Sequence, residues 1–238
     1  MPNVDLILGA DPGRKRAIRT EPTQRRSTQR LDALLDAAAE IVDETGFERL
    51  TTQMVAERAG ASIGTVYRYF PDRVAVLHAL RERSIRRFRE RVADDLERAD
   101  LQNWWDVVDL ALEACASLYR DEPGFSVVQS GRRETAEDSP EPEFALRIAQ
   151  LIEAEFGLEA DDPELRFRLG IAIELGDALI SRAFEREPAG DERYLAEAKR
   201  IVHDYLAEHL GRARGADAGD WGTALDDALR LRVASRVD

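Results

Sequence analysis

The sequence predicts an all-α protein, and two features of the chain lead to that prediction. Apolar residues recur at three- and four-residue spacing in segment after segment, which is the period of an amphipathic helix. No run of alternating β-branched residues bounded by turn residues occurs, so strands are not needed to explain the pattern. Ser, Thr or Asp precedes several periodic segments, where a side-chain oxygen can cap the first turn of a helix.

The predicted helices form two groups. Residues 1–26 hold three prolines and a basic cluster without apolar periodicity, which predicts a flexible basic N-terminal arm. Residues 27–75 are expected to form one small helical domain and residues 76–210 a second, larger one. Residues 211–238 are rich in Gly, Ala and Asp, and we expect a tail with at most one weak helix.

The first domain contains three predicted helices and the start of a fourth. The first begins at Ser27 or Thr28 and ends at Gly46, with inward-facing residues Leu31, Leu34, Leu35, Ala38, Ile41 and Val42. A second, short helix begins at Thr51 or Thr52 and ends at Gly60, and Ser62 caps a third that runs to Phe70. Pro71 ends the third helix, and Asp72 caps a fourth whose inward residues are Val74, Leu77, Leu80, Ile85 and Phe88.

The second domain contains four predicted helices, over residues 104–119, 142–156, 163–185 and 191–210. The last two carry broad apolar faces, more than the core of one domain of this size needs. We therefore expect part of their surface to pack against a second copy of the chain, as a homodimer. The alternative is that these helices only close the core of a monomer.

Composition excludes several classes of protein. No stretch without a charged residue is longer than nine residues, so a membrane-spanning helix of roughly 20 apolar residues is not expected. The single cysteine, Cys115, rules out an internal disulfide framework and a multi-cysteine metal site, and the N-terminus lacks the basic start of a secretory signal. These features predict a soluble, cytoplasmic protein with no metal and no cofactor.

Charge is distributed unevenly along the chain. The net charge of −13 divides into 17 basic and 13 acidic residues in positions 1–91, and 17 basic and 34 acidic residues in the remainder. Residues 14–30 alone hold seven basic residues and one acid: Arg14, Lys15, Arg16, Arg19, Glu21, Arg25, Arg26 and Arg30. Such asymmetry indicates an acidic partner, nucleic acid or membrane, at one end of the molecule only.

The segment from Thr51 to Arg73 has the features of a helix-turn-helix. Ala56 supplies a small side chain where two helices would cross, and Gly60, four residues later, tolerates the positive φ of a tight turn. The third helix contains no acidic residue that would repel phosphate. Taken with the basic arm, these features predict that the third helix enters the major groove of DNA.

The same block resembles a known family. Residues Leu34 to Leu80, with T-T…V-A-E-R-A-G-A-S-I-G-T-V-Y-R-Y-F-P-D-R…L, strongly resemble the DNA-binding domain of the tetracycline-repressor (TetR) family of bacterial transcriptional regulators. The run Gly64 to Phe70 is the most specific part of that signature. One residue departs from the family: Arg73 stands where a lysine is usual, and it can still neutralise a phosphate.

The resemblance implies a DNA-contacting surface on the second and third helices. The residues expected on it are Thr51, Thr52, Gln53, Ser62, Ile63, Gly64, Thr65, Tyr67, Arg68, Tyr69 and Arg73. Hydroxyls at helix N-termini and on the tyrosines would donate to phosphate, and Arg73 would bind one. Gln53 and Arg68 would reach base edges or the backbone, while Ile63 and Thr65 would meet thymine methyl groups. The alternatives are core packing for Tyr67 and Tyr69 and a merely solvated charge for Arg68.

The resemblance also implies an effector-sensing, dimeric second domain. In the family the last two helices form a four-helix bundle between subunits, here residues 163–185 and 191–210, which suits a palindromic DNA operator. Candidates to bind an unknown small-molecule effector are Trp104, Trp105, Leu112, Cys115, Tyr119, Phe125, Phe144, Ile148, Phe167 and Glu174. Plain core packing, or a solvated surface position for Glu174, is the alternative for these residues.

The resemblance implies a transcriptional regulator that is released from DNA when its effector binds. Two other classes of function are alternatives to it. Catalysis is not expected, because His78, His203 and His209 stand in no metal-binding or nucleophile motif. An all-α adaptor dimer without sequence-specific DNA binding would explain the helices, but not the acid-free third helix or the basic arm. The sequence is compatible with repression and with activation, and the resemblance favours repression, because members of the family usually repress their own genes.

Overall fold

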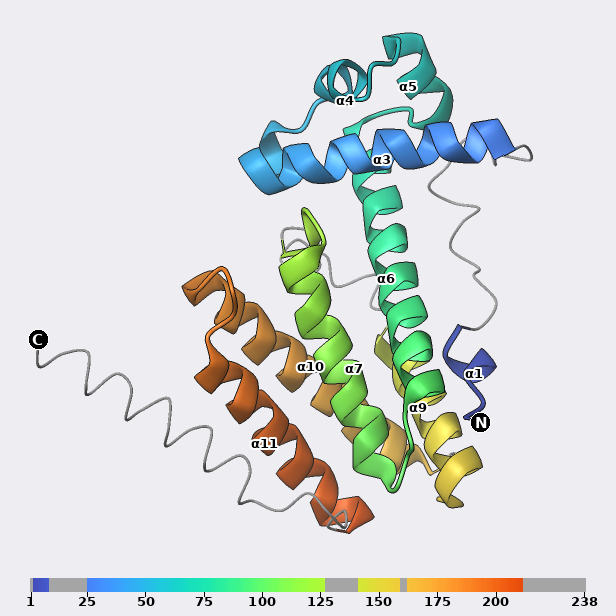
Figure 1. Cartoon of the computed structure of the whole chain (residues 1–238), viewed down its shortest axis with the longest axis vertical. Helices are drawn as coiled ribbons and strands as arrows, with labels where there is room; N and C mark the ends of the chain where they lie inside the picture. The colour runs from blue at the N-terminus through green and yellow to red at the C-terminus, as the bar shows by residue number, and fades with distance from the viewer. Residues whose placement is uncertain (1, 9–24, 127–140, 159–161, 212–238) are drawn as a thin grey trace, which may run out of the picture. The chain divides into compact units, whose positions relative to one another are not determined.

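The computed structural model describes residues 2–8, 25–126, 141–158 and 162–211, and every regular element within these ranges is a helix (Figure 1). In chain order the elements are α1 (Asp5–Leu8), α3 (Arg25–Thr45), the 3₁₀ helix η1 (Phe47–Arg49), α4 (Thr52–Arg58), α5 (Ile63–Tyr69), α6 (Arg73–Arg98), α7 (Trp104–Asp121), α9 (Glu141–Phe156), α10 (Pro163–Arg186) and α11 (Glu192–Leu210). The predicted all-α class is confirmed. Within these ranges, no helix combines the length and apolar character that crossing a bilayer requires.

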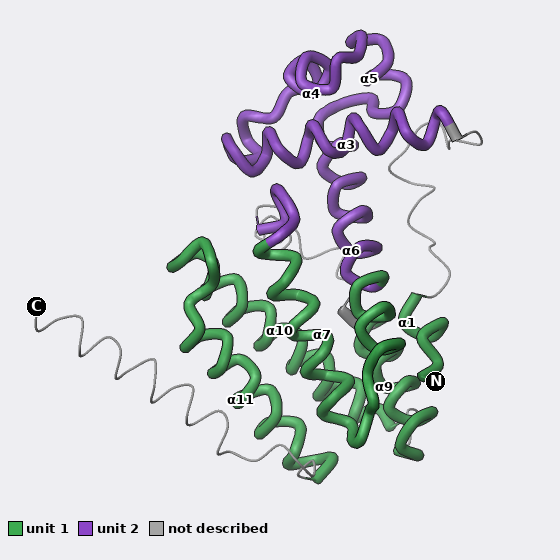
Figure 2. The backbone as a smooth tube through the Cα atoms, in the orientation of Figure 1, with its two compact units in different colours: residues 1–8, 90–120, 139–238 green, residues 9–89, 121–138 purple. Residues whose placement is uncertain are grey.

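The chain divides into two compact units, coloured separately in Figure 2. Unit 2 comprises residues 9–89 and 121–138, and unit 1 comprises residues 1–8, 90–120 and 139–238. The sequence places a domain boundary after residue 75, whereas α6 continues without a break across that point and belongs to unit 2 as far as Arg89. The turn that follows α7 also belongs to unit 2.

Unit 2 is built around one apolar core that α3, α4, α5 and the start of α6 share. Its largest fully buried side chains are Leu34, Ile41, Leu50, Tyr69, Phe70 and Leu80. Val74, which the sequence predicts inside, is 48% exposed, and Val76 is buried instead. Successive residues of a helix are about 100° apart, so the face defined by Val76, Ala79 and Leu80 turns Val74 away from the core.

Ion pairs and one backbone contact complete unit 2. Arg83 lies in α6 with only 6% of its side chain exposed, and its Nη1 donates to Asp36 Oδ1 of α3 at 2.7 Å. Arg87, one turn further along α6, pairs with Glu122 in the turn after α7. In the same turn the backbone N–H of Gly124 donates to Asp43 Oδ1 at 2.9 Å. The turn therefore packs on α3 as part of unit 2.

Unit 1 is a helical bundle in which α10 packs against both α9 and α11. Gly176 of α10 allows a close approach, because a Cβ at this position would lie 2.6 Å from Leu112 Cδ2 of α7. The buried His203 of α11 stacks on the indole of Trp104, with 5.6 Å between ring centroids. On the same helix, Lys199 Nζ lies 2.7 Å from Asp109 Oδ1 of α7.

Residues 2–8 differ from the flexible arm that the sequence predicts. The short helix α1 packs on α9, and Ile7 is fully buried there. Arg147 of α9 donates through Nη1 to the carbonyl of Leu6 at 3.0 Å, and the backbone N–H of Asn3 donates to Glu155 Oε1 at 3.1 Å. Arg25 and Arg26, the last two residues of the predicted arm, begin α3. Residues 9–24 of the arm, with most of its basic cluster, and the predicted tail beyond Gly211 lie outside the described residues.

Asp191 is the polar residue on which the junction of α10 and α11 depends. It is 2% exposed and caps α11, where Oδ1 accepts the backbone N–H of Arg193 at 3.1 Å. Its Oδ2 accepts Arg186 Nε at 3.1 Å. Although burial alone would raise its pKa, the hydrogen bonds from Arg186 and Arg193 outweigh burial and hold the pKa of Asp191 below its usual value.

We expect Asp191→Ala to reduce the free energy of unfolding by about 2 kcal/mol, because it removes a helix cap and the buried carboxylate that accepts from Arg186 and Arg193. Asp191→Asn keeps the cap and should lose about half as much. A carboxylate whose folded pKa is lowered stabilises the fold above its unfolded pKa of ~3.9 and loses that contribution as the pH falls through the folded value. Urea denaturation at pH 7 and in acid, below the unfolded pKa, measures the difference in unfolding free energy between the wild type and each variant. That difference should shrink in acid.

Candidate nucleic-acid interface

Helices α4 and α5 form a helix-turn-helix closed by backbone hydrogen bonds. The backbone N–H of Gly60 donates to the carbonyl of Glu57 at 3.2 Å, and that of Ala61 donates to the carbonyl of Ala56 at 2.9 Å. Gly60 has φ +59°, in the left-handed region that glycine adopts without strain. Ala56 is 5% exposed, as expected of a small residue where the two helices meet. The turn predicted from Ala56 and Gly60 is therefore present.

Both helices begin with a hydroxyl cap. Thr51 Oγ1 accepts the backbone N–H of Met54 at 3.2 Å, and Ser62 Oγ accepts that of Thr65 at 3.2 Å. The Ser62 and Thr65 hydroxyls also lie 2.9 Å apart. A cap of this kind uses an oxygen lone pair and leaves the hydroxyl proton of Thr51 available for a phosphate oxygen, whereas the Ser62–Thr65 contact uses one of the two protons of that pair.

The surface formed by α4, α5 and the start of α6 carries most of the residues expected to contact DNA. The exposed ones on α4, α5 and the start of α6 are Thr51, Gln53, Ser62, Ile63, Gly64, Tyr67, Arg68 and Arg73. Thr52 and Thr65 are half-buried. Ile63 and Tyr67 are 40% and 48% exposed, unusual values for large apolar or aromatic side chains.

Two contacts organise this surface further. Thr52 Oγ1 donates to the Tyr67 hydroxyl at 3.4 Å, which brings the first turn of α4 beside the middle of α5. Arg73 Nη1 donates to the carbonyl of Glu48 at 3.1 Å, and its guanidinium lies 5.8 Å from the ring centroid of Phe47.

Gln53 is oriented within its own helix. Its Nε2 donates to Glu57 Oε1, one turn further along α4, at 2.9 Å. The amide oxygen and the second N–H of Gln53 are not used by that contact, so the oxygen can accept from a base edge and the N–H can donate to a base edge or a phosphate.

Tyr69 does not lie on this surface. It is 1% exposed, and its hydroxyl lies 2.8 Å from Ser27 Oγ at the start of α3. This placement corresponds to the core-packing alternative, because a side chain between Val66 and Phe70 on the inward face cannot present its hydroxyl to a phosphate. We therefore leave Tyr69 out of the residues proposed to touch DNA.

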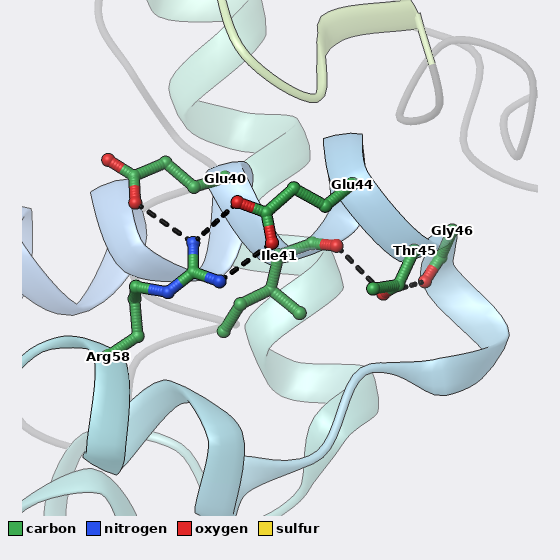
Figure 3. Close-up of polar contacts among 6 residues, drawn as sticks. All are labelled: Glu40, Ile41, Glu44, Thr45, Gly46 and Arg58. Atoms are coloured by element: carbon green, nitrogen blue, oxygen red, sulfur yellow. Dashed lines mark hydrogen bonds and ion pairs between the residues drawn. The ribbon is translucent and has the colours of Figure 1, made fainter.

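Arg58 fixes α4 on α3, a role that the sequence pattern does not predict. Its guanidinium lies between two carboxylates of α3, with Nη2 2.7 Å from Glu44 Oε2 and Nη1 3.2 Å from Glu40 Oε2 (Figure 3). Hydrogen bonds to Glu44 and Glu40 raise the pKa of Arg58, and the hydrogen bond from Arg58 lowers the pKa of Glu44. The available signal was a pair of acids four residues apart on the exposed face of α3.

The residues considered for effector binding are not all together. Most lie buried in unit 1: Trp104, Trp105, Leu112 and Tyr119 on α7, with Phe144 and Ile148 on α9. Cys115 is half-buried on α7. The structure does not support three placements, because Phe167 is 62% exposed, Glu174 is exposed, and Phe125 belongs to unit 2.

The histidines form no metal site in the part of the chain that the structure describes, and no cluster of three metal-binding side chains occurs there. His203 packs against Trp104 and Trp105, and His209 Nε2 lies 2.9 Å from Asp162 Oδ2. These positions explain both residues without a catalytic role.

A capped, acid-free helix presented by a glycine turn on a three-helix core defines a helix-turn-helix DNA-binding protein. Comparison with known proteins identifies the family more closely. Residues 34–80 match the model of the bacterial regulatory proteins of the tetR family, and residues 102–210 match that of a tetracyclin repressor-like C-terminal domain.

Relatives of known name agree with the family models. The HTH-type transcriptional repressor KstR of Mycolicibacterium smegmatis is 39% identical over 211 residues, 87% of this chain and 88% of the relative. A crystal structure of a TetR-family transcriptional regulator from Streptomyces coelicolor is 35% identical, with a TM-score of 0.64 over 75% of this chain and 98% of that one. The fatty acid metabolism regulator protein of Bacillus subtilis matches over 64 residues only, at 31% identity, which is 27% of this chain and 33% of that protein.

The chain therefore belongs to the TetR family of bacterial transcriptional regulators. It is a DNA-binding regulator and not an enzyme. Family membership also decides against an adaptor without DNA binding.

Gly64 offers a direct test of the interface. A Cβ at this position would meet no protein atom nearer than Ser62 Oγ at 3.9 Å, so packing within the protein does not require a glycine there. Gly64→Ala should leave the fold intact, or stabilise it by up to about 1 kcal/mol through helix propensity. It should nevertheless weaken DNA binding by about tenfold or more, because the methyl group separates α5 from the groove. Thermal unfolding and a fluorescence anisotropy titration measure the two effects, and undiminished DNA binding would remove Gly64 from the interface.

Proposed function

We propose that this protein is a ligand-responsive transcriptional repressor that binds a palindromic operator as a homodimer and is released by a small-molecule effector. The observation that carries the proposal is the outer face of α5, which is exposed, free of acids and lined with hydroxyl donors. Repression is supported by the name of the relative from M. smegmatis, which matches along most of both chains. Binding to chromosomal DNA implies that the protein acts in the cytoplasm.

The proposed DNA contacts divide into two groups. The hydroxyls of Thr51 and Tyr67 and the guanidinium of Arg73 would hold phosphates, and the Thr52 hydroxyl, which donates to that of Tyr67, would orient it. These contacts would fix the position of the protein on the duplex. Ser62, Ile63, Gly64, Thr65 and Arg68 begin or line α5 and would meet base edges or the adjacent backbone, with Gln53 beside them. The basic cluster at residues 14–30 would add sequence-independent attraction.

The homodimer is proposed to form through α10 and α11. Phe167 on α10 is the most exposed large hydrophobic residue in the part of the chain that the structure describes, at 62%, which is costly for a phenylalanine that faces only water. A two-fold interface would cover it and place two recognition helices about one turn of DNA, roughly 34–36 Å, apart. Glu174 is exposed on the same helix, so the alternative of a surface position suits it better than effector binding.

The effector is proposed to bind in unit 1 among the aromatic residues of α7 and α9. It regulates DNA binding only if it binds more tightly to a conformation whose recognition helices no longer fit the operator. A thermal-shift screen of small molecules identifies such a compound, because preferential binding to the folded state raises the unfolding midpoint.

Phe167→Glu tests the dimer. Because each copy contributes its phenylalanine to a two-fold interface, we expect the dimer dissociation constant to rise at least about a hundredfold. The monomer should keep its unfolding midpoint, since the side chain is already exposed in the single chain. Sedimentation equilibrium measures the association, with Glu185→Gln on the same helix as the matched control. An unchanged dimer would place the interface elsewhere.

Selection of bound duplexes from a random DNA pool tests the proposal as a whole. We expect an enriched palindrome whose half-sites are centred about 10 base pairs apart or a multiple of that spacing. Enrichment of a single unrepeated site would contradict the homodimer, and no enrichment at all would contradict operator recognition.

A further inference from the structure

The hydroxyl of Tyr69 lies within hydrogen-bond distance of three groups, two on Ser27 and one on Arg68. It lies 2.8 Å from Ser27 Oγ and 3.3 Å from the carbonyl oxygen of Ser27, both at the start of α3. Arg68 Nη2 donates to the same oxygen at 3.3 Å. A hydroxyl with one proton and two lone pairs can satisfy all three contacts at once.

Only one assignment of protons satisfies every group. The Tyr69 hydroxyl accepts from Arg68 Nη2 and from the Ser27 hydroxyl, and it donates its own proton to the carbonyl of Ser27. That proton is then not available for a phosphate oxygen. The buried hydroxyl is thus fully committed inside the protein, which is why burial does not leave an unsatisfied polar atom.

Arg68 is held by the ring of Tyr69 as well as by its hydroxyl. The guanidinium carbon lies 5.1 Å from the ring centroid, a cation–π distance. Arg68 itself is exposed on α5, next to Tyr67 on the surface proposed to meet DNA. A long side chain restrained at two points loses less conformational entropy on binding than an unrestrained one.

We propose that Tyr69 is a positioning residue for DNA recognition: its hydroxyl, held by Ser27 at the start of α3, keeps Arg68 ready for the groove. This inference rests on the proposed function, because it assigns a role within that same interface. Tyr69 touches no nucleotide and acts through Arg68.

The test is a double-mutant cycle on the full chain. Tyr69→Phe removes the hydroxyl and keeps the buried ring, and we expect about a tenfold loss of affinity for the duplex that the wild type enriches from a random pool. In the Arg68→Ala background the same change should cost less than about twofold, since the residue it positions is gone. Ser27→Ala, which removes one donor and no ring, should lose about threefold and show the same dependence on Arg68.

Tyr67→Phe is the matched control, because it removes an exposed phenol hydroxyl two residues away. Its loss of affinity should be the same in the presence and absence of the Arg68 side chain. Thermal unfolding of every variant shows whether the fold is retained. Should Tyr69→Phe and Ser27→Ala weaken binding equally in both Arg68 backgrounds, Tyr69 would act only through stability and the inference would be overturned. Failure of the wild type to enrich any duplex would instead refute the proposed function, and the inference with it.

Discussion

Burial of one face of α5 is the constraint on which the rest of the interface depends. The helix has seven residues, and helices shorter than roughly 12–15 residues are barely stable in water by themselves. It persists because Val66, Tyr69 and Phe70 are at most 1% exposed in the core of unit 2 and because Ser62 caps its first turn. With those three residues fixed inside, helical geometry alone decides which residues face outward. The surface proposed to read DNA is in this sense a consequence of the core.

The remaining freedom of the motif is removed by contacts of different kinds. The turn between α4 and α5 is held by short-range backbone hydrogen bonds at Gly60 and Ala61, which specify the local angle. The angle of α4 to α3 is set by the Val55 and Ala56 packing and by the fork of Arg58 on Glu44 and Glu40. Exposed ion pairs contribute little to stability. Arg58 instead fixes the orientation of α4 on α3, because a planar guanidinium binds its partners only in a narrow geometry.

Periodicity explains which parts of this structure the sequence predicts and which it does not. Tyr67 and Tyr69 are two residues, or about 200°, apart on α5, so only one of them can share the inward face of Val66 and Phe70. The position of Tyr69 in the helical repeat therefore predicts that it is buried. The partner of its hydroxyl, Ser27, lies 42 residues away, so no local sequence pattern predicts that contact. The docking of α1 was unpredictable for two reasons: four residues are too few to show a period, and Arg147, which binds the Leu6 carbonyl, is 141 residues distant.

The net charge of −13 raises the question of how so acidic a chain binds a polyanion. Charges further apart than about 10 Å are largely screened at moderate ionic strength, so the local surface decides. On α5 there is no acid, and several acids on neighbouring helices have partners: Glu40 and Glu44 face Arg58, Asp36 faces Arg83, and Glu57 accepts from Gln53. Asp72 accepts the backbone N–H of Ala75 at the start of α6. The pairings with Arg58 and Arg83 place positive charge beside carboxylates that would otherwise repel phosphate, so these acids oppose DNA binding less than their number suggests.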